Sequence, residues 1–256
     1  MIIDAHLHAD TRPVENFMDM KMAGVEAIIS CAHDPLEMRK SNVTIEHLNR
    51  IVYSEPKRVS KHNIKLFAAV GVHPRAIPED YENVIAKLPD YMAEDHVIAV
   101  GEIGLDEVTD IQKEVFIKQL QYADENNYNV IVHTPRTNKA EVTKSTIEVL
   151  DEYIDPRNVQ LDHIDYSIVD MAIDKDYTLG ITVQPQKMSV EGTVAMLDEY
   201  GFDKFVVDTD ISSAPSNHMA LAQLKHKLIQ DGYKKQDINK VLYENVMKFH
   251  GDNLKI

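Results

Sequence analysis

Short apolar runs alternate with longer polar segments along this chain, and that alternation restricts the fold more than any other feature. The runs are rich in β-branched residues and lack a clean period of two, which is typical of strands covered on both faces. Eight such strands, each followed by a helix, would close a (β/α)8 TIM barrel. The runs lie at residues 1–8, 25–31, 64–73, 97–106, 129–135, 158–163, 177–184 and 205–210.

The segments between the runs are predicted to be helices. Residues 110–127 and 137–153 carry apolar side chains at helical spacing, and residues 216–249 are predicted to form two helices that close the ring. The charged segment 34–62 is predicted to be a helix with an irregular lead-in. A doubly wound open sheet is the main alternative, because it uses the same alternation. We therefore predict the α/β class, as a TIM barrel with C-terminal closing helices.

The length and composition indicate one globular unit. The 256 residues are 44% hydrophobic, enough for a sizeable core, and barrels of this length commonly form one domain. We predict a single domain over residues 1–256, since no linker, repeat or low-complexity segment interrupts it. The single cysteine, Cys31, is expected to be a core thiol. No signal-like segment or apolar stretch of about 18 residues is found, so we expect a cytoplasmic protein without a membrane partner.

The charge of the chain restricts its partners. The formal net charge is −15, from 27 basic and 42 acidic residues. Such a surface repels polyanions, whereas extended duplex binding needs many contacts from Lys and Arg to phosphates. We therefore expect no stable binding of duplex nucleic acid. A small molecule or a short single-stranded nucleic acid can still enter a local site, so the expected substrate is one of these two.

Ionisable side chains gather at the ends of the apolar runs. The C-terminal ends of barrel strands meet on one face, where the active sites of such barrels form. Carboxylates crowded there would repel one another, but a divalent ion stabilises carboxylate and neutral imidazole together. This convergence therefore predicts a metal site. The residues concerned are His6, His8, His73, Glu102, Asp106, His133, Asp162, His163, Asp208 and Asp210.

The first run, MIIDAHLH, is the most specific of these signals. His6 and His8 alternate along the predicted strand, so both side chains point to the same face, and Asp4 shares their parity. Two imidazoles on one face can bind a single cation. The remaining histidines are predicted to be surface or capping groups: His33, His47, His62, His96, His218, His226 and His250.

Together these motifs resemble the TatD-like branch of the amidohydrolase superfamily. The resemblance extends from residue 1 to about residue 250 and implies a metal-dependent hydrolase. Some relatives carry a carboxylated lysine at the end of the fourth strand; this chain has none there, and Glu102 would supply the bridging carboxylate. The matching segments are His-x-His (6–8), G-V-H-P (71–74), G-E-I-G-L-D (101–106), V-H-T (132–134), D-H (162–163), D-T-D (208–210) and E-N-V-M-K-F (244–249).

The resemblance implies a centre of two divalent metal ions. Imidazole and carboxylate ligands suit Zn, Mn, Ni or Fe, and Mg suits a more oxygen-rich site. The implied ligands are His6, His8 and Asp210 for one ion and His133 and His163 for the other, with Glu102 bridging the pair.

The chain departs from the family pattern at three places. The segment D-T-D-I-S-S-A-P (208–215) replaces Glu-Thr-Asp-Ala-Pro and carries residues 211–213 as an insertion, so the metal ligand is assigned to Asp210, with Asp208 as the second choice. The segment H-I-D-Y-S (163–167) replaces His-Cys-Phe-Ser/Thr-Gly, which concerns the substrate contacts. Arg75 follows G-V-H-P in place of a further histidine. Because an arginine beside a metal cluster can anchor phosphate or carboxylate, we predict three substrate-binding residues: His73, Arg75 and Arg136.

By the same resemblance, the chain would act like a TatD-type deoxyribonuclease, in which a metal-activated water attacks a phosphodiester bond. Two ions roughly 3.5–4 Å apart lower the pKa of such a water. Glu102 and Asp210 are the predicted catalytic residues, with Asp210 accepting the proton. Two alternatives stay open: hydrolysis of a small-molecule ester, lactone or amide at the same metal centre, and a metal-dependent binding protein without activity. The residues predicted to orient the histidines are Asp4, Asp162 and Asp208.

Overall fold

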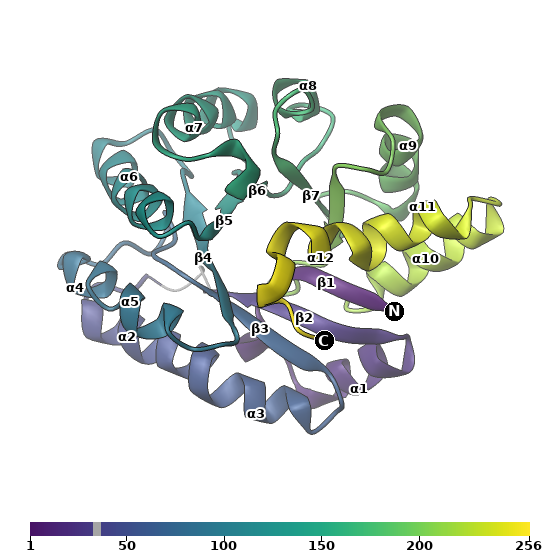
Figure 1. The fold of residues 1–256 in the computed structure, drawn as a ribbon, viewed down its shortest axis with the longest axis horizontal. Coiled ribbons are helices and arrows are strands. Elements are labelled where there is room, and N and C mark those ends of the chain that lie inside the picture. The colour runs from purple at the N-terminus through teal and green to yellow at the C-terminus, as the bar shows by residue number, and fades with distance from the viewer. Residues whose placement is uncertain (33–36) are drawn as a thin grey trace.

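The eight apolar runs form the strands of one parallel sheet. In the computed structural model, which describes residues 1–32 and 37–256, the strands pair in chain order. Figure 1 shows the helices arranged around the outside of this sheet. The strands are β1 (Ile2–Leu7), β2 (Val25–Cys31), β3 (Lys65–Val70), β4 (Val97–Gly104), β5 (Asn129–His133), β6 (Val159–Leu161), β7 (Thr178–Thr182) and β8 (Phe205–Asp208).

The ring closes between the end of β8 and β1. The backbone N–H of Asp210 donates to the carbonyl of His6 at 2.9 Å, and the N–H of His8 donates to the carbonyl of Ile211 at 3.0 Å. The sheet is therefore a nearly closed barrel, which excludes the doubly wound open sheet. The predicted (β/α)8 TIM barrel is confirmed, and its closure brings the His-x-His motif beside Asp210.

The predicted helices agree with the structure to within a few residues. Helix α6 (Asp110–Glu125) begins after Thr109, whose hydroxyl accepts the Gln112 N–H, and α7 (Lys139–Tyr153) covers the second predicted segment. The other helices of the described residues are α1 (Val14–Met22), α2 (Ser41–Asn49), α3 (Glu55–Ser60), α4 (Glu82–Ile85), α5 (Leu88–Met92), α8 (Val169–Ala172), α9 (Val190–Tyr200), α10 (Ala220–Gln230), α11 (Lys235–Asn239) and α12 (Asn245–His250).

Two of the predicted helical segments contain π-helical turns. The turn Arg50–Ser54 joins α2 to α3, and the turn Lys240–Glu244 joins α11 to α12. The segment 34–62 is thus helical from Ser41, while part of its predicted lead-in lies outside the described residues, as does His33. The segment 216–249 forms two helical rods, as predicted: α10, and then α11 continued by α12.

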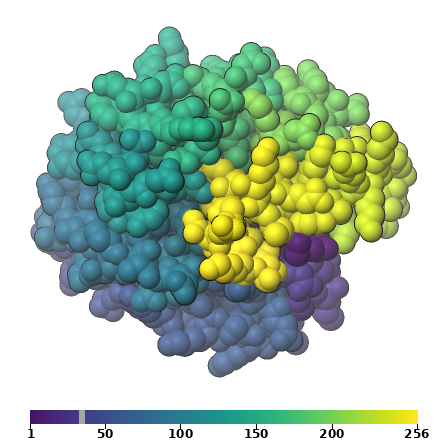
Figure 2. Space-filling view, viewed as in Figure 1, coloured from purple at the N-terminus to yellow at the C-terminus, as the bar shows by residue number. Residues whose placement is uncertain are grey.

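The C-terminal segment covers the N-terminal end of the barrel. Asn245 donates to the carbonyl of Phe205 at 2.7 Å, and Asn129 donates to the carbonyl of Phe249 at 2.8 Å. Phe205 and Asn129 are the first residues of their strands, so α12 lies across the end where the strands begin. Figure 2 shows this segment over the centre of that face. The opposite end, where the strands finish, carries the predicted site.

Buried apolar side chains form two clusters around this sheet. The larger cluster packs the strands against the helices, and includes Phe17, Phe116 and Leu197. The smaller one combines side chains of β1 to β5 and β8 with Val246 and Leu254 from the C-terminal segment. Cys31 belongs to the smaller cluster and is fully buried, as predicted, and burial raises the pKa of its thiol to about 12.

Candidate metal centre

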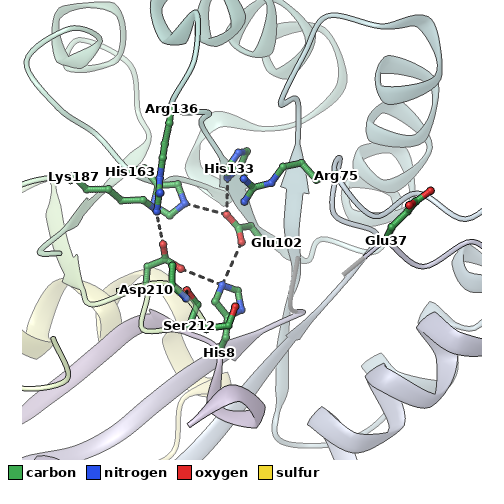
Figure 3. A pocket seen from close by; sticks show the side chains of 12 residues that line it. His8, Glu37, Arg75, Glu102, His133, Arg136, His163, Lys187, Asp210 and Ser212 are labelled. Carbon is green, nitrogen blue, oxygen red and sulfur yellow. Dashed lines mark hydrogen bonds and ion pairs between the residues drawn. The ribbon is translucent and has the colours of Figure 1, made fainter. Parts of the chain in front are cut away.

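The ends of five strands bring the predicted ligands together. His6 lies near the end of β1, with His8 directly after it, and His133 is the last residue of β5. His163 and Asp210 each lie two residues beyond a strand end, and both have backbone φ angles in the left-handed region, at 61° and 41°. These turns point the two side chains back over the mouth of the barrel, as Figure 3 shows.

The carboxylate of Glu102 lies at the centre of this cluster. Its Oε1 atom is 2.9 Å from Nδ1 of His133 and 3.1 Å from Nε2 of His163. The carboxylate is 2% exposed. One oxygen of Glu102 therefore faces the two histidines that were predicted to bind the second ion.

The other oxygen of Glu102 faces a different set of imidazoles. Oε2 lies 3.3 Å from Nε2 of His6, 3.9 Å from Nε2 of His8 and 3.6 Å from Nε2 of His73. His6 and His8 are the histidines predicted to bind the first ion. A carboxylate whose two oxygens face two separate groups of nitrogen donors has the geometry of a bridging ligand.

Asp210 completes the group around the first strand. Its Oδ1 atom lies 3.0 Å from Nε2 of His8, and the imidazoles of His6 and His8 have ring centroids 5.1 Å apart. Within His6, His8 and Asp210, one ligand atom from each residue lies within 4.8 Å of the others. This set is the same as the one that the resemblance implied for one ion.

The residues present fit divalent metal ions. Among the described residues, Nε2 of His6 and Nε2 of His73 are buried and make no hydrogen bond, although both face Glu102. Burying a nitrogen without a hydrogen-bond partner destabilises the fold unless the nitrogen coordinates a cation through its lone pair. The donor set of imidazoles and carboxylates also suits the predicted Zn, Mn, Ni and Fe. The assignment of ligands to particular ions stays a prediction.

His73 was predicted to bind substrate, but the structure places it among the candidate ligands. Its Nε2 atom joins Glu102 and His133 in a further group whose ligand atoms lie within 4.8 Å of one another, and a third group contains His6, Glu102 and His163. Burial lowers the pKa of His73 to about 4, which keeps this ring neutral at pH 7. Its position at the end of the third apolar run was the signal for this role.

Of the three aspartates predicted to orient the histidines, Asp162 contacts an imidazole. Oδ2 of Asp162 lies 2.8 Å from Nδ1 of His6, and Gln160 donates to the other oxygen of Asp162 at 2.9 Å. This bond leaves the other ring nitrogen of His6 directed at Glu102. Asp162 therefore has the contact that an orienting residue requires.

The predictions for Asp4 and Asp208 need correction. Asp4 instead accepts two hydrogen bonds from Thr209, from its N–H at 3.0 Å and from its hydroxyl at 2.6 Å, so it holds the segment that carries Asp210. The carboxylate of Asp208 is buried and makes no hydrogen bond within the described part of the chain. Strand parity for Asp4 and a strand-end position for Asp208 predicted that they lie near the histidines, but neither signal determines a hydrogen-bond partner.

The electrostatics of the site distinguish Glu102 from Asp4 and Asp208. Burial alone would raise the pKa of Glu102, but the surrounding imidazoles, His6 first among them, outweigh burial and hold the pKa well below its ordinary value. By contrast, burial raises the pKa of Asp4 to about 7, and burial together with the charge of Asp162 raises the pKa of Asp208 well above its ordinary value. Glu102 is therefore ionised and available as a ligand.

A cavity of about 320 Å³ opens over this cluster. The predicted anchors Arg75 and Arg136 both line this cavity. Nη2 of Arg136 donates to Gln184 at 3.3 Å, and Nε of Arg75 lies 3.7 Å from Oδ1 of Asp106. The inserted residues also reach the cavity, since Ser212 and Ser213 line it. The full lining is His8, Glu37, Arg75, Glu102, His133, Arg136, His163, Lys187, Asp210, Ser212, Ser213 and Ala214.

Two site residues were not predicted from the sequence. Asp106, noted only as an ionisable strand-end residue, lies with Oδ1 3.0 Å from Nε2 of His133. Lys187 follows β7 and places its ammonium against His163 and Asp210. The only signal for Lys187 is its position in the loop after the seventh apolar run, which by itself does not indicate where the side chain points.

Of the histidines predicted as surface or capping groups, the six that the structure describes lie outside this cluster, and His250 needs correction. His250 is only 2% exposed, because α12 packs against the end of the barrel where the strands begin. His96 is half-buried and lies 2.7 Å from the carbonyl of Val52, while His226 is exposed. His47, His62 and His218 are half-buried.

Comparison with known proteins agrees with this geometry. Residues 3–251 match the model of a family described as TatD related DNase. A protein of Methanocaldococcus jannaschii described as an uncharacterized metal-dependent hydrolase is 36% identical over 251 residues, which cover 97% of this chain and 99% of that relative.

Solved structures show the same fold. The crystal structure of a TatD-like protein from Archaeoglobus fulgidus superposes with a TM-score of 0.83 at 28% identity, covering 96% of this chain and 98% of that one. A phosphotriesterase homology protein from Escherichia coli, solved with phosphate in its active site, superposes with a TM-score of 0.72 at 16% identity and covers 97% and 98% of the two chains. Because the identity to the Escherichia coli protein is only 16%, this similarity shows a shared fold and nothing more.

No helix among the described residues combines the length and the apolar character that crossing a lipid bilayer requires.

Proposed function

The chain belongs to the TatD-related DNase family of metal-dependent hydrolases, and from this premise we propose that it cleaves phosphodiester bonds with two divalent ions. The observation that carries the proposal is the orientation of Glu102, whose Oε1 faces His133 and His163 while its Oε2 faces His6 and His8. Ions bound to the two groups would supply an activated water and neutralise charge that develops on the substrate.

Asp210 is the proposed proton acceptor of this reaction. One of its oxygens faces His8 at 3.0 Å and its side chain lines the cavity, so a water bound above the cluster would lie within its reach. Burial alone would raise the pKa of Asp210, but the neighbouring ammonium of Lys187 and the bond to His8 hold it well below its ordinary value. Asp210 therefore enters the reaction as a carboxylate.

The proposed substrate is a small phosphodiester or the end of a short single-stranded nucleic acid. Arg75 and Arg136 line the cavity and can bind phosphate oxygens, which offsets locally the net charge of −15. A cavity of about 320 Å³ has the size of a small-molecule site, which suits a small phosphodiester or a strand end rather than a duplex. We propose a cytoplasmic location, since a lone buried thiol at Cys31 suits a reducing compartment.

Two measurements test this function. Elemental analysis of protein purified without added metal should find two divalent ions per chain. The metal-loaded protein is then assayed against bis-p-nitrophenyl phosphate, single-stranded and duplex oligonucleotides, and a set of esters and lactones. Turnover of the phosphodiesters supports the proposal. Turnover of carbonyl compounds alone would overturn it in favour of an esterase or lactonase, and a protein inert with every metal would favour a binding role.

A further inference from the structure

The ammonium of Lys187 lies in the wall of the cavity between two candidate ligands. Its Nζ atom is 2.5 Å from Oδ2 of Asp210 and 3.1 Å from Nδ1 of His163, and the side chain is 10% exposed. Figure 3 shows it reaching across the mouth of the barrel. Asp210 therefore directs one oxygen to His8 and the other to Lys187.

The loop that carries Lys187 is firmly attached to the rest of the site. Gln184 donates from Nε2 to the backbone carbonyl of Asp210 at 2.6 Å, and the N–H of Lys187 donates to the carbonyl of Gln184 at 3.1 Å. Gln186 has a φ of 71°, in the left-handed region, and turns the chain between them. These contacts fix the loop backbone from which the side chain of Lys187 reaches the cavity.

Lys187 has more hydrogen-bond donors than the site has acceptors for them. An ammonium carries three donors, and within residues 1–32 and 37–256 its acceptors are Asp210 and His163 alone. Nδ1 of His163 also lies 2.6 Å from the hydroxyl of Thr182. If Nε2 of His163 binds a metal, its Nδ1 carries the proton and donates to Thr182, so it no longer accepts from Lys187. Two donors of Lys187, which lines the cavity, are then available to a ligand bound there.

Arg136 reinforces the positive charge on this wall. Its guanidinium donates to Gln184, which lies in the same loop as Lys187, and both cationic side chains line the cavity. Arg75 comes from a different loop, on the far side of Glu102. A substrate that enters between them meets cations on two sides, and charge-assisted hydrogen bonds favour an anionic oxygen strongly over a neutral one.

We propose that Lys187 binds a non-bridging oxygen of a phosphate ester and thereby selects phosphate esters over neutral carbonyl substrates. The proposal rests on the proposed function for the reaction itself, but it assigns a contact and a selectivity to a residue outside the predicted ligand set. A neutral ester or lactone leaves the ammonium donors without an anionic partner, and a site built for a charged group rejects a substrate that lacks it.

The test compares Lys187→Met with Lys187→Arg, and with Lys227→Met as a control, because Lys227 pairs with Asp231 on the surface and does not line the cavity. Binding of inorganic phosphate to the metal-loaded proteins is measured by calorimetry, and metal content by elemental analysis. We expect Lys187→Met to bind phosphate at least tenfold more weakly with metal content unchanged. Lys187→Arg should recover part of that loss, and Lys227→Met should match the unmodified protein.

Other outcomes separate this role from its alternatives. Unchanged phosphate affinity in Lys187→Met would overturn the proposal. Loss of bound metal, or an equal loss of kcat/KM for a phosphodiester and a lactone, would overturn it too, since Lys187 would then act by holding Asp210. If the unmodified protein cleaves no phosphate ester but binds phosphate through Lys187, the proposed function fails and this inference stands.

Discussion

Nδ1 of His6 lies 2.8 Å from Oδ2 of Asp162, and both side chains are fully buried. Because Nδ1 is engaged on this side of the ring, Nε2 is left to face Glu102. The two residues belong to β1 and to the end of β6, 156 positions apart in the chain. This contact determines which nitrogen of His6 is offered to a metal, so changes to either partner should act on the metal centre.

Replacing Asp162 should weaken metal binding without removing a ligand. Asp162→Ala leaves His6 free to rotate or to change tautomer, and loss of such an orienting partner typically costs about 10–100-fold in metal affinity. Titration of the metal-free protein with Zn²⁺ or Mn²⁺ measures the change. Asp203→Ala, which alters an exposed aspartate that pairs with Lys240, serves as the control. Unchanged affinity in Asp162→Ala would show that His6 needs no orienting partner.

A methyl group added at Gly180 should have the same effect through packing. A Cβ at this position in β7 would overlap Oδ1 of Asp162 and lie 2.9 Å from its Cγ atom. Since Gly180 has no side chain in the site, Gly180→Ala can act only by displacing Asp162. We expect reduced metal affinity and a lower Tm, measured by metal titration and thermal unfolding. The double variant Gly180→Ala with Asp162→Ala should bind metal no more weakly than Asp162→Ala alone.

Substitution of Asp210 should remove activity more than it removes metal. Asp210→Asn keeps the shape of the side chain but loses the carboxylate that is proposed to accept the proton, and loss of a general base costs roughly 10²–10⁴-fold in rate. We expect kcat for the phosphodiester to fall within this range, with no more than one ion lost per chain by elemental analysis. Asp203→Asn is the matched control. Retention of full activity by Asp210→Asn would exclude Asp210 as the proton acceptor.

His250 should make the metal-free protein less stable in acid. Burial lowers its pKa to about 3, and its ring nitrogens have no hydrogen-bond partner among the described residues. A histidine in the unfolded chain has a pKa of about 6.5, so the unfolded state takes up a proton at a higher pH than the folded state does. The free energy of unfolding therefore falls as the pH drops below about 6.5. Between pH 8 and pH 4.5, His250 should lower the free energy of unfolding by about 2–3 kcal/mol.

The variant His250→Leu isolates this effect. It fills a similar volume without a titratable group, so its free energy of unfolding relative to the unmodified protein should rise as the pH is lowered. Urea unfolding in the presence of a chelator at pH 8, 6 and 4.5 measures the difference. A difference that stays constant across this range would contradict the prediction, because it would show that His250 takes up no proton on unfolding.

The sequence alone was sufficient for the barrel and for the convergence of its ionisable residues. Strand and helix periodicities follow from local backbone geometry, so runs such as 97–106 and 129–135 could be identified without tertiary information. A parallel barrel then places all strand ends on one face, which brought Glu102, His133 and Asp210 together before any contact was known.

Only the tertiary structure decided which of these side chains meet and how. Asp4 and Thr209 are 205 positions apart, and their hydrogen bonds depend on how β8 closes against β1. Lys187 enters the cavity because Gln186 turns the loop with a positive φ, a conformation that the amino-acid type alone does not specify. His250 is buried because α12 packs across the barrel. Periodicity assigns a residue to an element and a face, whereas its partner is chosen by loop conformation and by packing between elements distant in the chain.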